Sequence, residues 1–192
     1  GIPRQTSGSV METIDYCGHL LKTFGRRLNP FISPLAPFLD PGSIAFENAE
    51  EVGYRVFYKT LEDYRRALLA PSWKYTLSYE TRWMTREEIV DSTYEAGLRL
   101  NRLKREHGLV SGETAEKTEK RILLAQEMIR EIDAILCDPE PGRTMKLKAL
   151  KETFDQASMA TVCDKDEIKW PVLRWRLNFP KIIRALFESR PS

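Results

Sequence analysis

The stretch from residue 85 to residue 136 repeats apolar residues at helical spacing and is interrupted once, around Ser111-Gly112. Thr85 and Glu88 have the spacing of a capping box, in which each side chain binds a backbone amide of the first turn. We expect one helix from there to about His107, ended by Gly108, and a second long helix after Gly112. Because the loop is short, an antiparallel helix hairpin is favoured. The residues expected to face inward are Ile89, Thr93, Ala96, Leu100 and Leu103 in the first helix, and Ile122, Ala125, Ile129, Ile132 and Leu136 in the second.

The first 43 residues combine a helix signal with a proline-rich apolar segment. Ser9 and Glu12 predict another capping box, and the helix that follows is expected to end at Gly25. Leu28–Leu39 is apolar but carries three prolines, which disfavour a helix. We therefore expect a short buried strand of the parallel type in this segment. Asp40-Pro41-Gly42-Ser43 has the composition of a turn and would end it.

The remaining segments predict further short helices, so the expected fold is mainly α with a few strands. Residues 48–70 read as two helical pieces ended by Pro71, while the aromatic-rich Ser72–Trp83 is compatible with extended or irregular structure. After the hairpin we expect a third helix over residues 144–160 and a last one from Lys181 to Glu188. The inward stripe expected in residues 48–70 consists of Leu61, Tyr64, Leu68 and Leu69.

Composition restricts the classes of partner. The chain has 30 Lys and Arg against 28 Asp and Glu, a net charge of +2. This balance disfavours nucleic-acid or anionic-membrane binding through long-range charge. No run of about 18 apolar residues could span a bilayer. Cys17, Cys137 and Cys163 are odd in number and far apart, and Gly1–Val10 lacks a secretory signal pattern, so we expect reduced thiols and a cytoplasmic location.

No group of residues has the spacing of a catalytic or metal site. Cys17 and His19 are two residues apart on the expected first helix and point to different faces, and no C-x-x-C, H-E-x-x-H or G-x-S-x-G motif is present. The carboxylate pairs Glu50-Glu51 and Glu87-Glu88 lie at expected helix starts, where they complement the helix dipole. We therefore expect no catalytic residue and no metal ligand in this chain.

Three blocks of the sequence resemble one enzyme family. Gly1-Ile2-Pro3-Arg4-Gln5-Thr6 resembles the G-[IL]-P-G-[EQ]-T segment that ends the fifth strand of the radical S-adenosylmethionine (SAM) barrel, with Arg4 where the family usually has Gly. Asn29–Ser43, which contains the sequence P-F-L-D-P-G-S, resembles the sixth strand and its exit turn in radical SAM enzymes with an N-terminal cobalamin-binding domain. The stretches E-E-V-G-Y-R-V-F, P-S-W-K-Y-T-L-S-Y-E-T-R-W-M-T-R-E-E-I-V and E-I-K-W-P-V are similar to the C-terminal extension of one such subgroup.

The resemblance implies the tail end of a partial (β/α) barrel in residues 1–43, a connector in 44–84 and a helical C-terminal domain in 85–192. In the family, a 4Fe-4S cluster held by a C-x-x-x-C-x-x-C loop cleaves SAM reductively, and cobalamin, where present, carries methyl groups or assists the radical step. That loop is absent from this sequence. The positions that the resemblance assigns to the wall of the SAM pocket are Gly1, Ile2 and Pro3 at one strand end and Leu35, Ala36 and Pro37 at the other.

Two functional hypotheses follow. In the first, the chain is the C-terminal part of a radical SAM enzyme, binds neither the 4Fe-4S cluster nor cobalamin by itself, and has the N-terminal part of the same enzyme as its partner, with an unidentified small-molecule substrate. In the alternative, it is a stand-alone helical interaction module for a protein or RNA. The interleaved cations and aromatics of Lys169–Arg176 could stack on bases, although burial of Trp170 and Trp175 in a core is the more ordinary interpretation.

Overall fold

The computed structural model describes residues 1–32, 36, 39–140 and 142–155. Contacts within the chain divide it into two units, Gly1–Val162 and Cys163–Ser192, and the second unit lies outside the described residues. The predicted helix from Lys181 to Glu188 and the basic-aromatic segment Lys169–Arg176 therefore lie outside them as well. Within these ranges, the fold is mainly α with one small two-stranded antiparallel sheet. No described helix is long and apolar enough to cross a membrane.

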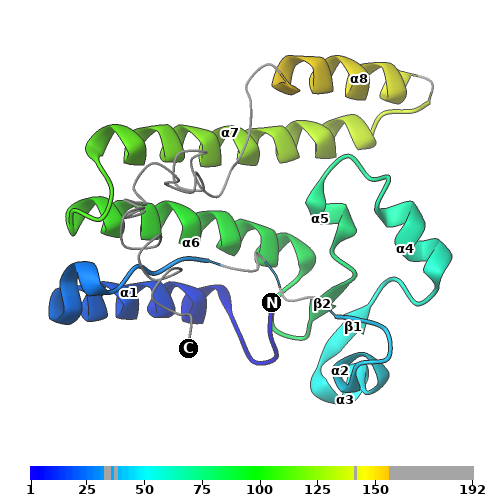
Figure 1. Cartoon of the computed structure of the whole chain (residues 1–192). Coiled ribbons are helices and arrows are strands. Elements are labelled where there is room, and N and C mark those ends of the chain that lie inside the picture. The colour runs from blue at the N-terminus through cyan, green and yellow to red at the C-terminus, as the bar shows by residue number, and fades with distance from the viewer. Residues whose placement is uncertain (33–35, 37–38, 141, 156–192) are drawn as a thin grey trace, which may run out of the picture. The chain divides into compact units, whose positions relative to one another are not determined.

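Long helices stacked side by side make up most of the described structure (Figure 1). Helix α1 (Ser7–Phe24) packs on α6 (Arg86–Glu106), and α6 packs on α7 (Gly112–Leu136). A shorter helix, α8 (Gly142–Asp155), contacts the other side of α7. The short connection between α6 and α7 makes them an antiparallel hairpin, which confirms the prediction for residues 85–136.

The ends of α6 show why this helix could be located from the sequence. The Thr85 hydroxyl accepts a hydrogen bond from the Glu88 amide at 3.2 Å, and the Glu88 carboxylate accepts one from the Thr85 amide at 2.7 Å. The helix is followed by Gly108 at φ 67°, a backbone angle that favours glycine. In the hairpin, the Asn101 side chain, which is buried, donates to the Ala115 carbonyl at 2.8 Å and ties α6 to α7.

The capping box predicted for the first helix was wrong in its residues. Helix α1 begins at Ser7, and its cap is Thr6, whose hydroxyl accepts from the Ser9 amide at 3.2 Å while Ser9 Oγ accepts from the Thr6 amide at 2.9 Å. Ser9 is thus the third helical residue rather than the cap. Threonine followed three residues later by serine gives the same reciprocal bonding as the Ser–Glu pair that the sequence suggested. The predicted end is confirmed, because Gly25 (φ 55°) caps α1 before the 3₁₀ turn η1 (Gly25–Arg27).

The segment between α1 and α2 does not form the predicted strand in any of its described residues, 28–32, 36 and 39. A parallel strand needs a neighbour with which to form backbone hydrogen bonds, and the described chain offers none here. Ile32 instead packs on the α1–α6 core, and Leu39 is buried farther along. The predicted turn is confirmed, with the Ser43 amide donating to the Asp40 carbonyl at 3.1 Å and Gly42 at φ 83°.

The connector between this turn and α6 alternates short helices with two short strands. Antiparallel pairing brings Tyr54 opposite Thr81, Arg55 opposite Glu80 and Val56 opposite Tyr79. The described part of residues 1–43 contains no strand, so the tail end of a partial (β/α) barrel that the resemblance implies there is not observed. The elements of the connector are α2 (Ile44–Glu47), α3 (Ala49–Val52), β1 (Tyr54–Val56), α4 (Leu61–Ala67), α5 (Trp73–Thr76) and β2 (Tyr79–Thr81).

The inward stripe predicted for residues 48–70 was mostly wrong. Leu61, Leu68 and Leu69 are 87%, 75% and 74% exposed. Helix α4 is a single capped segment that ends at Ala67, so Leu68 and Leu69 do not continue its face. Its inward residues are Ala67, which is buried, and Tyr64, whose hydroxyl donates to the Leu39 carbonyl at 3.3 Å.

Two buried clusters form the described core. The first, which we call the Tyr79 cluster, joins the segment before α2 to the connector and to the start of α6. The second lies between α1 and α6 and consists of Ile14, Ala96 and Leu100. The members of the Tyr79 cluster are Leu39, Leu77, Tyr79, Met84 and Ile89.

Candidate functional site

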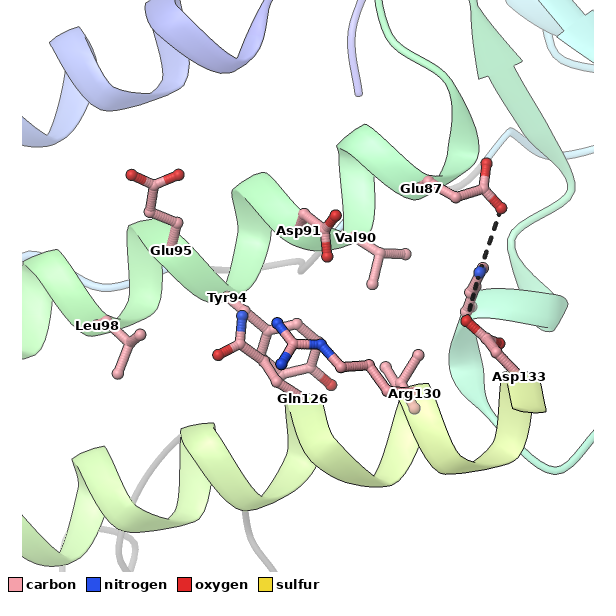
Figure 2. A pocket seen from close by; sticks show the side chains of 11 residues that line it. Glu87, Val90, Asp91, Tyr94, Glu95, Leu98, Gln126, Arg130 and Asp133 are labelled. Carbon is pink, nitrogen blue, oxygen red and sulfur yellow. Dashed lines mark hydrogen bonds and ion pairs between the residues drawn. The ribbon is translucent and has the colours of Figure 1, made fainter. Parts of the chain in front are cut away.

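A pocket of about 440 Å³ lies between α6 and α7, close to the end of α7 that meets the connector. Its floor is apolar, because Val90 and Ile129 are buried, and its walls are polar. Figure 2 shows the two rows of side chains that face this space from the two helices. The lining residues are Glu87, Val90, Asp91, Tyr94, Glu95 and Leu98 of α6, Gln126, Ile129, Arg130 and Asp133 of α7, and Lys74 of α5.

Lys74 is the buried charge of this site. It lies in α5, a one-turn helix capped by Ser72, whose hydroxyl accepts a hydrogen bond from the Lys74 amide at 3.2 Å. Only 7% of the residue is exposed. Its Nζ lies 2.8 Å from Asp133 Oδ2 and 3.2 Å from Glu87 Oε1, the two interactions dashed in Figure 2. An ammonium group at this depth requires such partners, because an unpaired buried charge is strongly unfavourable.

The pKa shifts at the site keep these groups ionised. Burial alone would lower the pKa of Lys74, but its hydrogen bonds to Asp133 and Glu87 outweigh burial and raise that pKa above its ordinary value. Burial likewise opposes ionisation of Glu87, but a backbone hydrogen bond and the Lys74 ammonium lower its pKa. Lys74 therefore remains a cation and is poorly suited to act as a base or a nucleophile.

Two tyrosines complete the polar side of the site. The Tyr75 hydroxyl donates to Asp133 Oδ1 at 2.6 Å, and burial together with this bond raises the pKa of Tyr75. The Tyr94 hydroxyl accepts a hydrogen bond from Trp73 Nε1 at 2.9 Å. Burial raises the pKa of Tyr94 despite that bond, so Tyr94 carries a phenolic proton that it can donate.

Three other charged residues of the lining, Asp91, Glu95 and Arg130, have no ion-pair partner among the described residues. The Asp91 carboxylate projects from α6 into the space between the helices, and the Arg130 guanidinium projects into the same space from α7 (Figure 2). The Gln126 amide lies beside Arg130, whereas Glu95 is directed away from α7. The site therefore combines a neutralised, buried ion cluster with Asp91 and Arg130, one charge of each sign that faces the space between the helices, an arrangement suited to binding a ligand rather than to proton transfer.

The described residues among those predicted for the wall of the SAM pocket do not line the pocket between α6 and α7. A Cβ atom added to Gly1 would lie 3.0 Å from the Tyr79 hydroxyl oxygen and 3.3 Å from Ile89, and Ala36 packs on the Tyr79 cluster as well. Gly1 and Ala36 are thus brought to one cluster from two distant segments. Ile2 is 49% exposed and Pro3 is half-buried. Leu35 and Pro37 lie outside the described residues.

The first residues form a turn with an unusual backbone. The Gln5 amide donates to the Ile2 carbonyl at 3.1 Å, which makes Ile2–Gln5 a β-turn with Pro3 and Arg4 in the middle. Arg4 has φ 63° and is the one non-glycine residue with positive φ in the described part of the chain. Proline at the first central position and a positive φ at the second are the features of a type II turn, which favours glycine where Arg4 stands.

The residues described here do not fit an iron–sulfur cluster. Cys17 lies on α1 and Cys137 follows α7, and both are free thiols. No group of three His, Cys, Asp or Glu residues close enough to hold a metal ion occurs in the described ranges. Cys163 lies outside them. The expectation that this chain alone holds no metal remains a prediction.

Sequence reasoning missed Lys74, Asp133 and their joint role. The two residues are 59 positions apart, and no local pattern connects them. The aromatic neighbours of Lys74 in Trp73-Lys74-Tyr75 were the available signal, since a cation within an apolar aromatic run needs a partner if the run is buried. Glu87 lies at a helix start, as predicted, and in addition binds Lys74.

Comparisons of the chain with models of protein families, with curated proteins and with solved structures gave no match.

Proposed function

We propose that the chain is the C-terminal part of a radical SAM enzyme of the cobalamin-associated type. The observation that carries this proposal is the backbone of Arg4. In the resemblance, Gly1–Thr6 corresponds to G-[IL]-P-G-[EQ]-T, and the one departure is Arg for Gly at position 4. Arg4 adopts φ 63°, an angle that ordinary residues avoid and glycine adopts freely. The one departure from the family pattern therefore lies at position 4, where the positive φ of the turn favours glycine, the residue that the family usually has.

The packing of the resembling blocks is a second support. Leu39 belongs to the block that resembles the sixth strand, and Tyr79, Met84 and Ile89 belong to the block that resembles the C-terminal extension. These residues share the Tyr79 cluster. Gly1, from the first block, lies against Tyr79 and Ile89. Blocks that resemble one family in sequence thus depend on one another for burial.

In this proposal the chain contributes shape rather than chemistry. Gly1 and Ala36, held on the Tyr79 cluster, would support one side of the SAM pocket. The 4Fe-4S cluster would be held by cysteines that are not in this sequence.

The test is the nucleotide sequence that precedes the codon for Gly1. The proposal predicts an open reading frame that encodes a C-x-x-x-C-x-x-C motif within the length of a barrel upstream of Gly1. A start codon directly before Gly1, or an upstream segment without such a motif, would contradict it.

A second candidate is a helical module that binds a protein partner, and the exposed leucines favour it. Leu61 is the first residue of α4, Leu68 and Leu69 follow its last residue, and all three are more than 70% exposed. Large apolar side chains exposed on neighbouring residues, such as Leu68 and Leu69, are typical of contact surfaces. A photo-crosslinking residue at position 68 should capture a defined protein in cells, whereas one at Glu127, exposed on α7, should not. Equal labelling from both positions would remove this candidate.

A further inference from the structure

The pocket between α6 and α7 contains charged groups that its own ion cluster does not use. Lys74 is satisfied by Glu87 and Asp133, and Asp133 also accepts from Tyr75. Asp91 and Arg130 face the same space from opposite helices and have no ion-pair partner among the described residues. Because they do not neutralise each other directly, each remains able to bind a charge that a ligand brings.

The charged donor and the charged acceptor lie on different walls. On the α7 side, the Arg130 guanidinium and the Gln126 amide can both donate hydrogen bonds, and the Tyr94 phenol of α6 can donate its proton to the same space. This set suits a carboxylate. On the α6 side, the Asp91 carboxylate can only accept, which suits an ammonium group.

The floor of the pocket is apolar, and the pocket is of limited size. Val90 and Ile129 are buried beneath it, and Leu98 closes one end. A volume of about 440 Å³ accommodates a small molecule and is at the lower end of the range for ligand pockets. An aliphatic group placed on this floor would bury apolar surface without an unsatisfied polar atom.

We propose that this pocket binds a free α-amino acid with an aliphatic side chain. Its carboxylate binds Arg130 and Gln126, its ammonium group binds Asp91, and its side chain lies on Val90, Leu98 and Ile129. A free amino acid carries both charged groups on one carbon atom, whereas a residue within a peptide has neither of these backbone charges. This inference does not depend on the radical SAM proposal, because none of these residues takes part in it.

The test is a titration of the ¹⁵N-labelled chain followed by nuclear magnetic resonance. L-Leucine is compared with 4-methylpentanoate, which lacks the ammonium group, and with 3-methylbutylamine, which lacks the carboxylate. Leucine should shift the amide signals of Val90, Leu98 and Ile129 with a dissociation constant on the order of 1 mM, as expected for so small a ligand. Each partial ligand should bind about tenfold more weakly, the loss expected for one charge-assisted hydrogen-bonded contact.

Two variants assign the contacts. Arg130→Gln should weaken the binding of leucine and of 4-methylpentanoate but leave the binding of 3-methylbutylamine unchanged. Asp91→Asn should weaken the binding of leucine and of 3-methylbutylamine but leave the binding of 4-methylpentanoate unchanged. Both residues are exposed and without ion pairs, so the variants should fold. Lys151→Gln and Glu131→Gln are matched controls, since both are exposed and outside the pocket lining.

Several results would overturn the inference. These are the absence of leucine-dependent shifts, a partial ligand that binds as tightly as leucine, or control variants that weaken binding as much as Arg130→Gln and Asp91→Asn. If either pocket variant failed to fold, the comparison of the three ligands on the unmodified chain would still decide whether the pocket binds both charged groups of leucine.

Discussion

Lys74→Met and Asp133→Asn remove opposite halves of the same ion pair, and we expect them to lower the free energy of unfolding by different amounts. The two side chains are joined by a 2.8 Å hydrogen bond but differ in environment, since the Lys74 side chain is 9% exposed and that of Asp133 is 33% exposed. Methionine has nearly the length of lysine without its charge. Asparagine retains the shape of aspartate and one carbonyl oxygen. Each substitution therefore tests charge with little change of volume.

The expected magnitudes follow from what each substitution leaves behind. Lys74→Met leaves Asp133 bonded to Tyr75 and partly solvated, and leaves Glu87, whose side chain is 62% exposed, free to turn to water. We expect a loss of about 1 kcal/mol in the free energy of unfolding. Asp133→Asn leaves a buried ammonium with only the exposed Glu87, and we expect a loss of about 2–3 kcal/mol, below the range for fully buried pairs.

The assay is urea unfolding followed by circular dichroism for both single variants and the double variant. The double variant should lose less than the sum of the two single losses, with a coupling energy of about 1 kcal/mol. Lys120→Met is the matched control, because Lys120 pairs with Glu116 at 2.8 Å with both side chains mostly exposed, and it should cost less than about 0.5 kcal/mol. A larger loss for Lys74→Met than for Asp133→Asn, or strict additivity, would refute the reasoning.

Three further predictions concern pH, the first turn and the connector. Because the pKa of Glu87 is lowered in the folded state, its contribution to stability is present above the ordinary pKa of 4.5 and is lost as pH falls through the folded pKa. The difference in free energy of unfolding between the unmodified chain and Lys74→Met, measured by urea unfolding, should therefore narrow below pH 4.5. A difference that stays constant with pH would contradict the role of this pair. Arg4→Gly should have a free energy of unfolding about 1 kcal/mol higher than Arg4→Ala, measured by urea unfolding, because position 4 has φ 63°. Equal stability of the two variants would show that the positive φ is not maintained. Gly53→Ala should cost about 2 kcal/mol or more, because Gly53 has φ 97° and an added Cβ would lie 2.5 Å from the Trp83 ring; a thermal unfolding midpoint equal to that of the unmodified chain would exclude this contact.

The helix hairpin could be predicted because its signals are local. Thr85 and Glu88 bond within one helical turn, Gly108 ends the helix through its own backbone angle, and the apolar repeat extends over many turns. The start of α1 was predicted less well, because Thr6 and Ser9 form the capping box three residues before the expected pair, Ser9 and Glu12.

The connector and the pocket could not be predicted in this way. Strands β1 and β2 have three residues each, too few for a periodic pattern, and their pairing joins Tyr54 to Thr81 across most of the connector. Leucines at helical spacing suggested a buried face on α4, but the helix ends at Ala67 before the pattern is complete. The contact between Lys74 and Asp133 depends on the packing of α5 against the hairpin, which no local rule supplies.

The measurement that tests the proposed function most directly is SAM cleavage by the complete product of the reading frame that contains this chain. The protein would be purified without oxygen, its iron content determined, and the formation of 5′-deoxyadenosine from SAM measured after addition of a strong reductant. Our proposal predicts about four iron atoms per chain, the content of one 4Fe-4S cluster, and formation of 5′-deoxyadenosine that depends on the reductant. A folded full-length product that holds no iron–sulfur cluster and leaves SAM intact would contradict it.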